Sequence, residues 1–299
     1  MLIPFLRRRS FLTGAGMVAL AAAGPAASAE AAPAKLPASP AKHPPAHGLL
    51  GHMTVGDGPE PVLVLHEWLG DHSNFALALP YFDVKRFRFV LADLRGYGLS
   101  RSLIGQYTIE EAASDALALM AHYGHQRFTA VGHSMSGMLV QYLMLHAPER
   151  LNRVVAISPV PPSGFHADDA ALAKLRAGVT DDDAARAATD GRTGHRYGPE
   201  WLDRKLAITR GAAPEAMLGY LKMFTTTDFS GSVGGLKTPL AVIAGEQDIP
   251  VYRPDAIEKA FGAWYPNLTV TGLRDSGHYS MLEEPGLFAA ALNKGLAGA

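Results

Sequence analysis

The sequence predicts an α/β fold with a mostly parallel central sheet, helices on both of its faces and a helical lid insertion. Short apolar runs alternate with helical patterns from residue 48 onward, and such alternation is typical of a parallel sheet covered on both faces. The alternation stops between about residues 159 and 236, where helical patches occur without a strand-like run. We therefore expect residues 47–158 and 237–299 to form the core and 159–236 the lid.

The expected strands are short apolar runs, as strands buried on both faces require; they span residues 62–65, 87–92, 128–131, 153–157, 240–244 and 268–270. The expected helices show apolar residues at helical spacing over residues 109–123, 135–146, 255–264 and 285–296. Ligands of such sheets bind at the carboxyl ends of the strands. Residues that directly follow a strand are therefore the first candidates for function.

Composition and charge narrow the classes of function. Apolar residues make up 48% of the chain and charged residues 18%, which is typical of a globular enzyme. The formal net charge is −1 at pH 7, so nothing favours nucleic acid or an anionic membrane as a partner. The chain has no cysteine, which excludes disulfides, thiolate nucleophiles and Cys-ligated metals.

Residues 1–29 have the pattern of a signal peptide. Arginines at 7–9 precede a short apolar stretch at 11–23, and small residues at 27–29 offer a cleavage site. The run at 8–12 resembles the twin-arginine signal, which directs the export of folded proteins. An ordinary secretory signal and an uncleaved anchor are the alternatives.

Residues 30–46 are rich in alanine and proline and are expected to form a flexible tether. Cleavage after residue 29 would leave no stable membrane anchor. We therefore expect a periplasmic or secreted protein.

Ser134 lies between an expected strand and an expected helix. It stands within the run Gly-His-Ser-Met-Ser-Gly at 132–137, and a serine at the apex of a strand–turn–helix forms a nucleophile elbow. A serine N-cap is the alternative interpretation. The fifth position of the G-x-S-x-G pattern, usually glycine, is Ser136 here. The amide of Met135 begins the helix and should stabilise an oxyanion.

A serine nucleophile needs a base, and the base needs an acid that orients it. His278, on the loop after the strand at 268–270, is the expected base. Asp248 follows the strand at 240–244 and is the expected acid, with Glu246 as a rival in the same loop. His133 adjoins the nucleophile and is expected to be a packing residue.

The second oxyanion donor is expected from the His-Glu-Trp-Leu-Gly run at 66–70, which follows the first expected strand. The backbone amide of Trp68 is the expected donor, with Glu67 possible if the loop is displaced. The Glu67 carboxylate could lie on the surface or could contact substrate or a water. No metal site is expected, because His72 comes six positions after His66 rather than the four of an H-E-x-x-H zinc motif.

These residues together resemble the α/β-hydrolase superfamily over roughly residues 48–298. The resemblance rests on the 66–70 run, the elbow, Asp248, Gly277-His278 and the D-x-R-G-x-G-x-S loop at 93–100, in the chain order serine, aspartate, histidine. That loop looks like the one in lidded esterases, cofactor-free perhydrolases, meta-cleavage C–C hydrolases and epoxide hydrolases. A serine at the elbow distinguishes the chain from epoxide hydrolases and haloalkane dehalogenases, which carry aspartate there.

The resemblance implies hydrolysis of a small or medium, largely apolar carboxylic ester through an acyl-enzyme on Ser134, without a cofactor. The alternatives are C–C bond hydrolysis, lactone opening or perhydrolysis with the same triad, and a ligand receptor on a hydrolase fold. Trp201, Tyr220, Met223 and Phe224 are candidates for the inner face of the lid; each could instead belong to the lid core. An apolar lid favours an apolar substrate.

Overall fold

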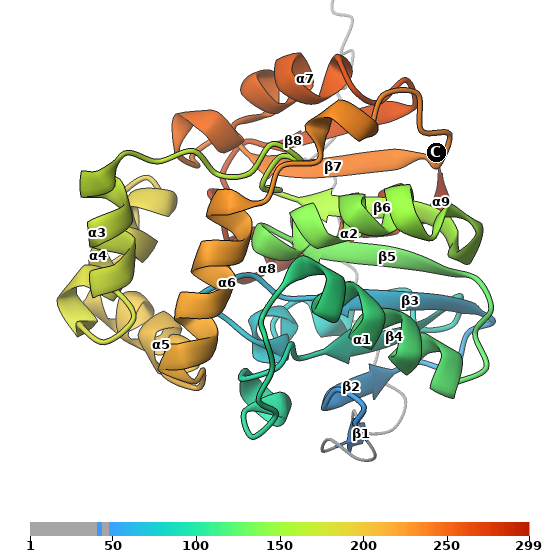
Figure 1. Cartoon of the computed structure of the whole chain (residues 1–299), viewed down its shortest axis with the longest axis horizontal. Helices are drawn as coiled ribbons and strands as arrows, with labels where there is room; N and C mark the ends of the chain where they lie inside the picture. The colour runs from blue at the N-terminus through green and yellow to red at the C-terminus, as the bar shows by residue number, and fades with distance from the viewer. Residues whose placement is uncertain (1–40, 44–47, 299) are drawn as a thin grey trace, which may run out of the picture. The chain divides into compact units, whose positions relative to one another are not determined.

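The computed structural model describes residues 41–43 and 48–298 (Figure 1). The predicted signal peptide at 1–29 and most of the predicted tether lie outside these residues. Within them, no helix is long and apolar enough to cross a membrane.

A sheet of eight strands in the order β1-β2-β4-β3-β5-β6-β7-β8 forms the centre of the described region. The first two strands pair antiparallel and the others pair parallel, which confirms the predicted fold class. The strands are β1 (Ala41–His43), β2 (His52–Val55), β3 (Glu60–Leu65), β4 (Phe87–Ala92), β5 (Phe128–His133), β6 (Leu151–Ile157), β7 (Leu240–Gly245) and β8 (Leu268–Leu273).

Helices flank this sheet and fill the segment between β6 and β7. The helices are α1 (Ile109–His122), α2 (Met135–His146), α3 (Asp169–Ala177), α4 (Asp182–Arg192), α5 (Pro199–Thr209), α6 (Pro214–Thr226), α7 (Pro254–Gly262), α8 (Ser280–Glu283) and α9 (Pro285–Ala297). Short 3-10 turns occur at η1 (His72–Phe75), η2 (Leu79–Tyr81), η3 (Gly98–Ser100), η4 (Pro148–Arg150), η5 (Ser230–Ser232) and η6 (Pro250–Tyr252).

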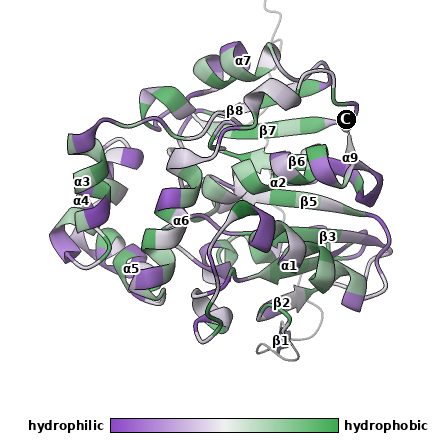
Figure 2. Cartoon of the chain, in the orientation of Figure 1, coloured by the Kyte–Doolittle hydropathy of each residue, from purple (hydrophilic) through white to green (hydrophobic). Residues whose placement is uncertain are grey.

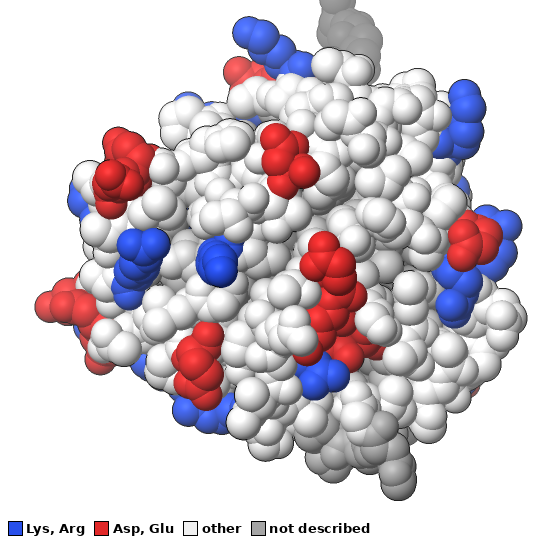
Figure 3. Space-filling view, viewed as in Figure 1, with Lys and Arg blue, Asp and Glu red and all other residues white. Residues whose placement is uncertain are grey.

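Each face of the sheet has its own hydrophobic cluster. One cluster includes the buried faces of α1, α2 and α7, and the other includes η1, η2 and α9. The strands between them are buried along most of their length and are predominantly hydrophobic (Figure 2). On the surface, acidic and basic side chains are interspersed over the face that Figure 3 shows.

The insertion between β6 and β7 consists of α3 to α6 and the turn η5, and the structure describes no strand there. Asp168 and Asp181 cap the first two of its helices by accepting hydrogen bonds from backbone amides at 2.8 Å. Pro199 and Pro214 begin the other two, where a missing N–H costs nothing. The local sequence therefore sets where each helix begins.

Two strands differ from the sequence prediction. Residues 41–43, within the range expected to be a tether, form β1 and pair with β2. The prediction of a tether is therefore wrong for residues 41–43. The strand was missed because backbone pairing at a sheet edge needs no apolar side chains. β2 was not predicted because its sequence, His-Met-Thr-Val, gives a short and mixed pattern.

Candidate active site

Ser134 sits at a strained turn between β5 and α2. Its backbone has φ 52° and ψ −109°, a region that side chains rarely adopt. The strand β6 and the segment after it hold the turn, because the Ser134 N–H donates to the Ile157 carbonyl at 2.8 Å and its carbonyl accepts from the Val160 N–H at 3.0 Å. A Cβ on Gly132 would lie 2.1 Å from the Ser136 carbonyl oxygen, so the turn requires glycine there.

Ser136 has a structural contact that glycine could not make. Its hydroxyl is fully buried and donates to the His66 carbonyl oxygen at 2.5 Å. The contact joins the first turn of α2 to the loop after β3. The departure from the usual glycine therefore connects the two segments that carry the expected oxyanion donors.

His278 and Asp248 form a buried hydrogen-bonded pair. The Nδ1 atom of His278 lies 2.6 Å from Oδ2 of Asp248, and both residues are 1% exposed. The other Asp248 oxygen accepts from the Ile249 N–H at 2.7 Å. With Nδ1 donating, the Nε2 lone pair of the imidazole is left to accept a proton. Glu246, the rival acid, is exposed.

Glu283 holds the loop that carries His278. The amides on both sides of the histidine, those of Gly277 and Tyr279, each donate to the Glu283 carboxylate at 2.8 Å. Arg196 of the insertion pairs with the same carboxylate. Burial raises the pKa of Glu283, opposed by these amides and the Arg196 charge. Sequence analysis missed Glu283, which lies outside the motifs and has no local signal beyond its place five residues after the histidine.

His133 is fully buried beside the pair of His278 and Asp248. Its Nε2 donates to the His278 carbonyl at 2.8 Å, and the two rings lie 5.0 Å apart. Burial, together with the repulsion that would arise if both neighbouring imidazoles were protonated, lowers the pKa of His133 to about 3. The neutral ring therefore packs against the loop of His278, as the sequence suggested.

The two expected oxyanion donors begin α2 and follow β3. Within the described part of the chain, no protein group accepts a hydrogen bond from the amide of Met135 or Trp68. The indole of Trp68 donates to the Met217 carbonyl at 2.8 Å and packs on Phe224 at 5.8 Å between ring centroids. The Trp68 side chain thus joins its loop to α6, while its amide remains available.

Glu67 does not lie on the surface, so that expectation is wrong. The residue is 2% exposed, and protein groups occupy both carboxylate oxygens. Oε1 accepts from Lys205 Nζ at 2.9 Å and Asn74 Nδ2 at 3.1 Å, and Oε2 accepts from the Leu69 N–H. The alternative for Glu67 was a contact with substrate or a water. In the structure its carboxylate contacts protein groups.

The Glu67 carboxylate remains charged in this buried position. Burial alone would raise its pKa, but the charge of Lys205 and the Leu69 amide more than offset that effect and lower the pKa to about 2. A buried carboxylate is stable only when it is paired and hydrogen-bonded. Glu67 and Lys205 thus form an ion pair inside the protein.

Lys205 connects α5 of the insertion to both catalytic loops. The lysine is 1% exposed; its Nζ donates to the Leu69 carbonyl at 2.5 Å and lies 4.8 Å from the centre of the Tyr279 ring. Thr209, one turn further along α5, donates to the same carbonyl at 2.7 Å. Sequence analysis missed Lys205, although it shares the buried face of α5 with Leu206 and Thr209.

Of the four candidate residues of the insertion, Met223 is 5% exposed, and each of the other three has its own set of neighbours. Tyr220 is fully buried between Tyr97 and Tyr107, at ring distances of 5.8 and 5.4 Å. Tyr220 therefore has the interior packing of the core alternative, here against two aromatic rings from outside the insertion. Trp201 stacks on Tyr197 at 4.4 Å and lines a cavity of about 410 Å³ beside α8.

Phe224 lies between Trp68 and the segment that leads into α3. Its ring is 5.8 Å from Trp68 and 6.4 Å from Phe165. Its side chain is 5% exposed. Of the candidates in the insertion, Phe224 therefore packs most directly on the loop that carries the expected oxyanion donor.

Asp71, His72 and Asp93 place possible metal-ligand atoms within 4.8 Å of one another. These atoms already have protein partners. Asp93 accepts from the amides of His72 and Leu99 and from the His72 ring, each at 2.7 Å, and Asp71 accepts from Ser73. Burial opposes protonation of His72, but the Asp93 carboxylate raises its pKa overall. The cluster joins the 66–72 and 93–100 loops.

The chain is similar to known proteins with the α/β-hydrolase fold. Residues 60–194 match the family model described as alpha/beta hydrolase fold. The chain is 25% identical over 252 residues to 3-oxoadipate enol-lactonase 2 of Acinetobacter baylyi, covering 81% of this chain and 91% of that protein. It is 23% identical over 247 residues to a putative carbamate hydrolase of Escherichia coli, covering 79% and 91%.

Solved structures share the fold at low sequence identity. The enol-lactonase from Burkholderia xenovorans superimposes with a TM-score of 0.72 at 23% identity, over 83% of this chain and 96% of that one. The carboxylesterase CesB from Bacillus subtilis superimposes with a TM-score of 0.71 at 18% identity, over 88% and 94%. The similar proteins thus agree in fold and differ in the substrate class that their names give.

Proposed function

Because the chain belongs to the α/β-hydrolase superfamily of enzymes, we propose that it is a serine hydrolase that cleaves a carboxylic ester or a lactone through an acyl-enzyme on Ser134. The observation that carries the proposal is the buried pair of His278 and Asp248, 2.6 Å apart. These residues follow the adjacent strands β8 and β7, and Ser134 follows β5 in the same sheet.

The proposed mechanism has two acyl-transfer steps. His278 takes the proton from the Ser134 hydroxyl as its oxygen attacks the carbonyl carbon, and the amides of Met135 and Trp68 stabilise the oxyanion. The tetrahedral intermediate collapses, and the leaving alkoxide takes the proton from His278. A water molecule, deprotonated by His278, then attacks the acyl carbon. The bond from this carbon to the Ser134 oxygen breaks, that oxygen takes the proton back from His278, and the acid is released. Asp248 orients the imidazole and stabilises its charged form.

A lactone is the second substrate class for the same chemistry. The similarity to two proteins named enol-lactonases favours it. A lactone is an ester whose alcohol remains attached to the acyl group, so the bonds broken and formed on Ser134 are the same. C–C bond hydrolysis and perhydrolysis with the same triad are the alternatives that a lack of turnover on every ester and lactone of the panel below would favour.

We also propose that α3 to α6 act as a lid and that the protein is exported. The insertion leaves the core after β6 and returns before β7, beside the strand ends that carry the catalytic residues (Figure 1). The arginines at 8 and 9 support export by the twin-arginine route to the periplasm or beyond. Cell fractionation of the wild type and of an Arg8→Lys/Arg9→Lys variant tests export, since the double variant should remain inside the cell.

A fluorophosphonate probe tests the nucleophile. We expect the purified protein to be labelled and Ser134→Ala to remain unlabelled. Rates on p-nitrophenyl esters from acetate to octanoate and on γ-lactones then identify the substrate class. A wild-type protein that resists the probe, or a Ser134→Ala variant that is still labelled, would overturn the proposed function.

A further inference from the structure

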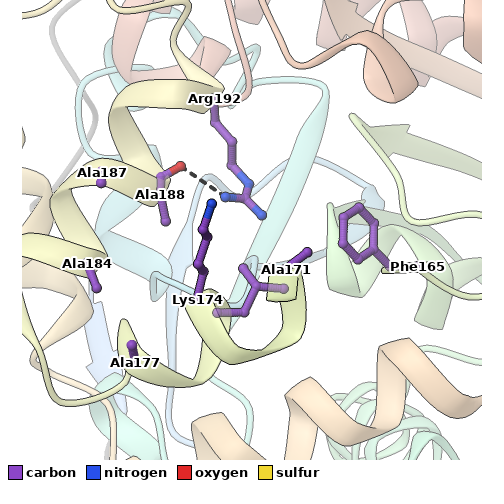
Figure 4. Close-up of a pocket in the computed structure, with 9 residues that line it drawn as sticks. Phe165, Ala171, Lys174, Ala177, Ala184, Ala187, Ala188 and Arg192 are labelled. Carbon is purple, nitrogen blue, oxygen red and sulfur yellow. Dashed lines mark hydrogen bonds between the residues drawn. The ribbon is translucent and has the colours of Figure 1, made fainter. Parts of the chain in front are cut away.

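A cavity of about 550 Å³ lies between α3 and α4 of the insertion (Figure 4). Five alanines, Leu175 and Phe165 form most of its wall, and the remaining two lining residues are the cations Lys174 and Arg192. The wall is therefore apolar except for two positive charges.

This cavity borders the residues that surround the catalytic base. The ring of Phe165 stacks on Tyr252 at 6.1 Å with an angle of 16° between the planes, and Tyr252 lies 5.0 Å from the His278 ring. The carbonyl of Arg192 accepts a hydrogen bond from the His278 N–H at 2.9 Å. A ligand held in the cavity would thus lie next to the groups that position the base.

The two cations have no acidic partner. Among the described residues, no carboxylate lies within 4.0 Å of the charged nitrogens of Lys174 or Arg192. The Arg192 guanidinium donates to the Ala188 carbonyl at 2.9 Å, and Figure 4 shows the ends of the two side chains pointing toward one another. Like charges that converge beside an apolar wall repel each other, and a bound anion removes that repulsion.

The charge of Arg192 acts on two tyrosines that pack against the expected base. Burial raises the pKa of Tyr252 and of Tyr279, and the Arg192 charge partly opposes that effect on both tyrosines. Their rings pack on His278 at 5.0 and 5.3 Å. The Arg192 charge therefore lies close to the two rings that pack on His278.

We propose that this cavity binds the acyl chain of an ester or lactone that carries a free carboxylate, with Lys174 and Arg192 holding the carboxylate. The inference rests on the proposed function of Ser134. It changes the expectation of a largely apolar substrate, because the alanine wall suits a short methylene chain while the two cations require a negative end. A monoester of a dicarboxylic acid and a lactone with a carboxylate side chain both fit this description.

Matched substrate pairs test the proposal. Mono-p-nitrophenyl glutarate and adipate carry the carboxylate, and p-nitrophenyl pentanoate and hexanoate are their neutral counterparts. We expect the wild type to favour the anionic member by about tenfold or more in kcat/KM, the size of a hydrogen bond to a charged group. The preference should fall in Arg192→Gln and in Lys174→Gln, and it should weaken with rising salt.

Arg176→Gln is the control, since this arginine is exposed on the same helix as Lys174 and does not line the cavity. It should leave the preference unchanged. Equal rates on both members of each pair, or a preference that survives Arg192→Gln and Lys174→Gln together, would overturn the proposal.

Calorimetric binding of the same monoesters to Ser134→Ala separates this proposal from the proposed function. Tighter binding of the anionic member that is lost in Ser134→Ala/Arg192→Gln supports the carboxylate site, even if the wild type hydrolyses neither ester. Equal binding of both members contradicts the site, even if the fluorophosphonate probe labels Ser134.

Discussion

Two of the buried acid–base pairs among the described residues, His278 with Asp248 and Lys205 with Glu67, differ in which atoms stay free to react. In the pair of His278 and Asp248, one imidazole nitrogen bonds the carboxylate and the other keeps a lone pair. In the pair of Lys205 and Glu67, the ammonium contacts the carboxylate, a backbone carbonyl and an aromatic ring. The first pair can move a proton, whereas the second has its donors committed to protein groups.

Buried charges thus have two different roles around one site. In the proposed mechanism, Asp248 stabilises an imidazole whose charge changes during the reaction. Glu67 and Lys205 keep fixed charges and connect α5 with the loop that carries Trp68 and with Tyr279, the neighbour of the catalytic histidine. We therefore expect changes in the first pair to reduce turnover with little loss of stability, and changes in the second to reduce both.

Asp248→Asn should give the largest effect. Without the carboxylate, the imidazole loses both its orientation and the partner for its positive charge, so kcat should fall by about 10⁴-fold. Steady-state kinetics on a p-nitrophenyl ester measure the loss. Glu246→Gln is the matched control, an exposed acid in the same loop that should keep full activity. If Glu246→Gln lost activity and Asp248→Asn kept it, Glu246 would be the acid that orients His278.

Glu67→Gln should cost stability because it leaves the Lys205 charge buried without its partner. Removal of one member of a buried ion pair costs about 3–5 kcal/mol in the free energy of unfolding, measured by urea denaturation. A Glu67→Gln/Lys205→Met double variant should recover part of this loss. Glu60→Gln, which breaks an exposed pair with Arg86, should cost less than about 1 kcal/mol. A double variant less stable than the single one would contradict the pairing.

Acidification tests the same pair without its removal. The pKa of Glu67 is about 2 in the folded protein, below its ordinary value of 4.5, so its ionisation stabilises the fold above pH 4.5. That stabilisation, on the order of 3 kcal/mol at most, is lost as the pH falls from 4.5 toward 2. The stability difference between the wild type and Glu67→Gln should therefore narrow in this range. A difference that stays constant with pH would show that Glu67 is not charged.

Ser136→Ala should give the smallest effect. It removes the hydroxyl that bonds the His66 carbonyl at 2.5 Å and leaves that buried acceptor without the bond, at a cost of about 1–2 kcal/mol. Thermal unfolding measures the change, and Ser232→Ala on the turn η5 is a control at an unburied serine. No difference between the two variants would show that the hydroxyl contact does not stabilise the elbow.

The sequence predicted most of the sheet and the residues that follow its strands. Ser134, Asp248 and His278 could be located because parallel strands bring their carboxyl ends to one edge, so local motifs after strands become neighbours. The order of the strands was not predicted, because apolar runs show which segments are buried and not which strands are neighbours. The short edge strands β1 and β2 lack that pattern, and sequence reasoning missed them.

The contacts between the insertion and the core could not be predicted in the same way. Lys205 lies 138 residues from Glu67 in the chain, and neither position has a local feature that names its partner. A charged residue is rarely buried unless it is paired. Without knowledge of the partner, each of these two residues is therefore expected to be exposed. The sequence left the position of Tyr220 open for a related reason, because an aromatic residue on a helix shows that a face is buried without showing which surface covers it.

The most direct measurement is mass spectrometry of the protein quenched during turnover of a p-nitrophenyl ester. The account predicts a covalent acyl adduct on the peptide that contains Ser134, formed in a burst of p-nitrophenol and absent from Ser134→Ala. Turnover without an acylated protein, or an adduct on a peptide other than that of Ser134, would contradict the account.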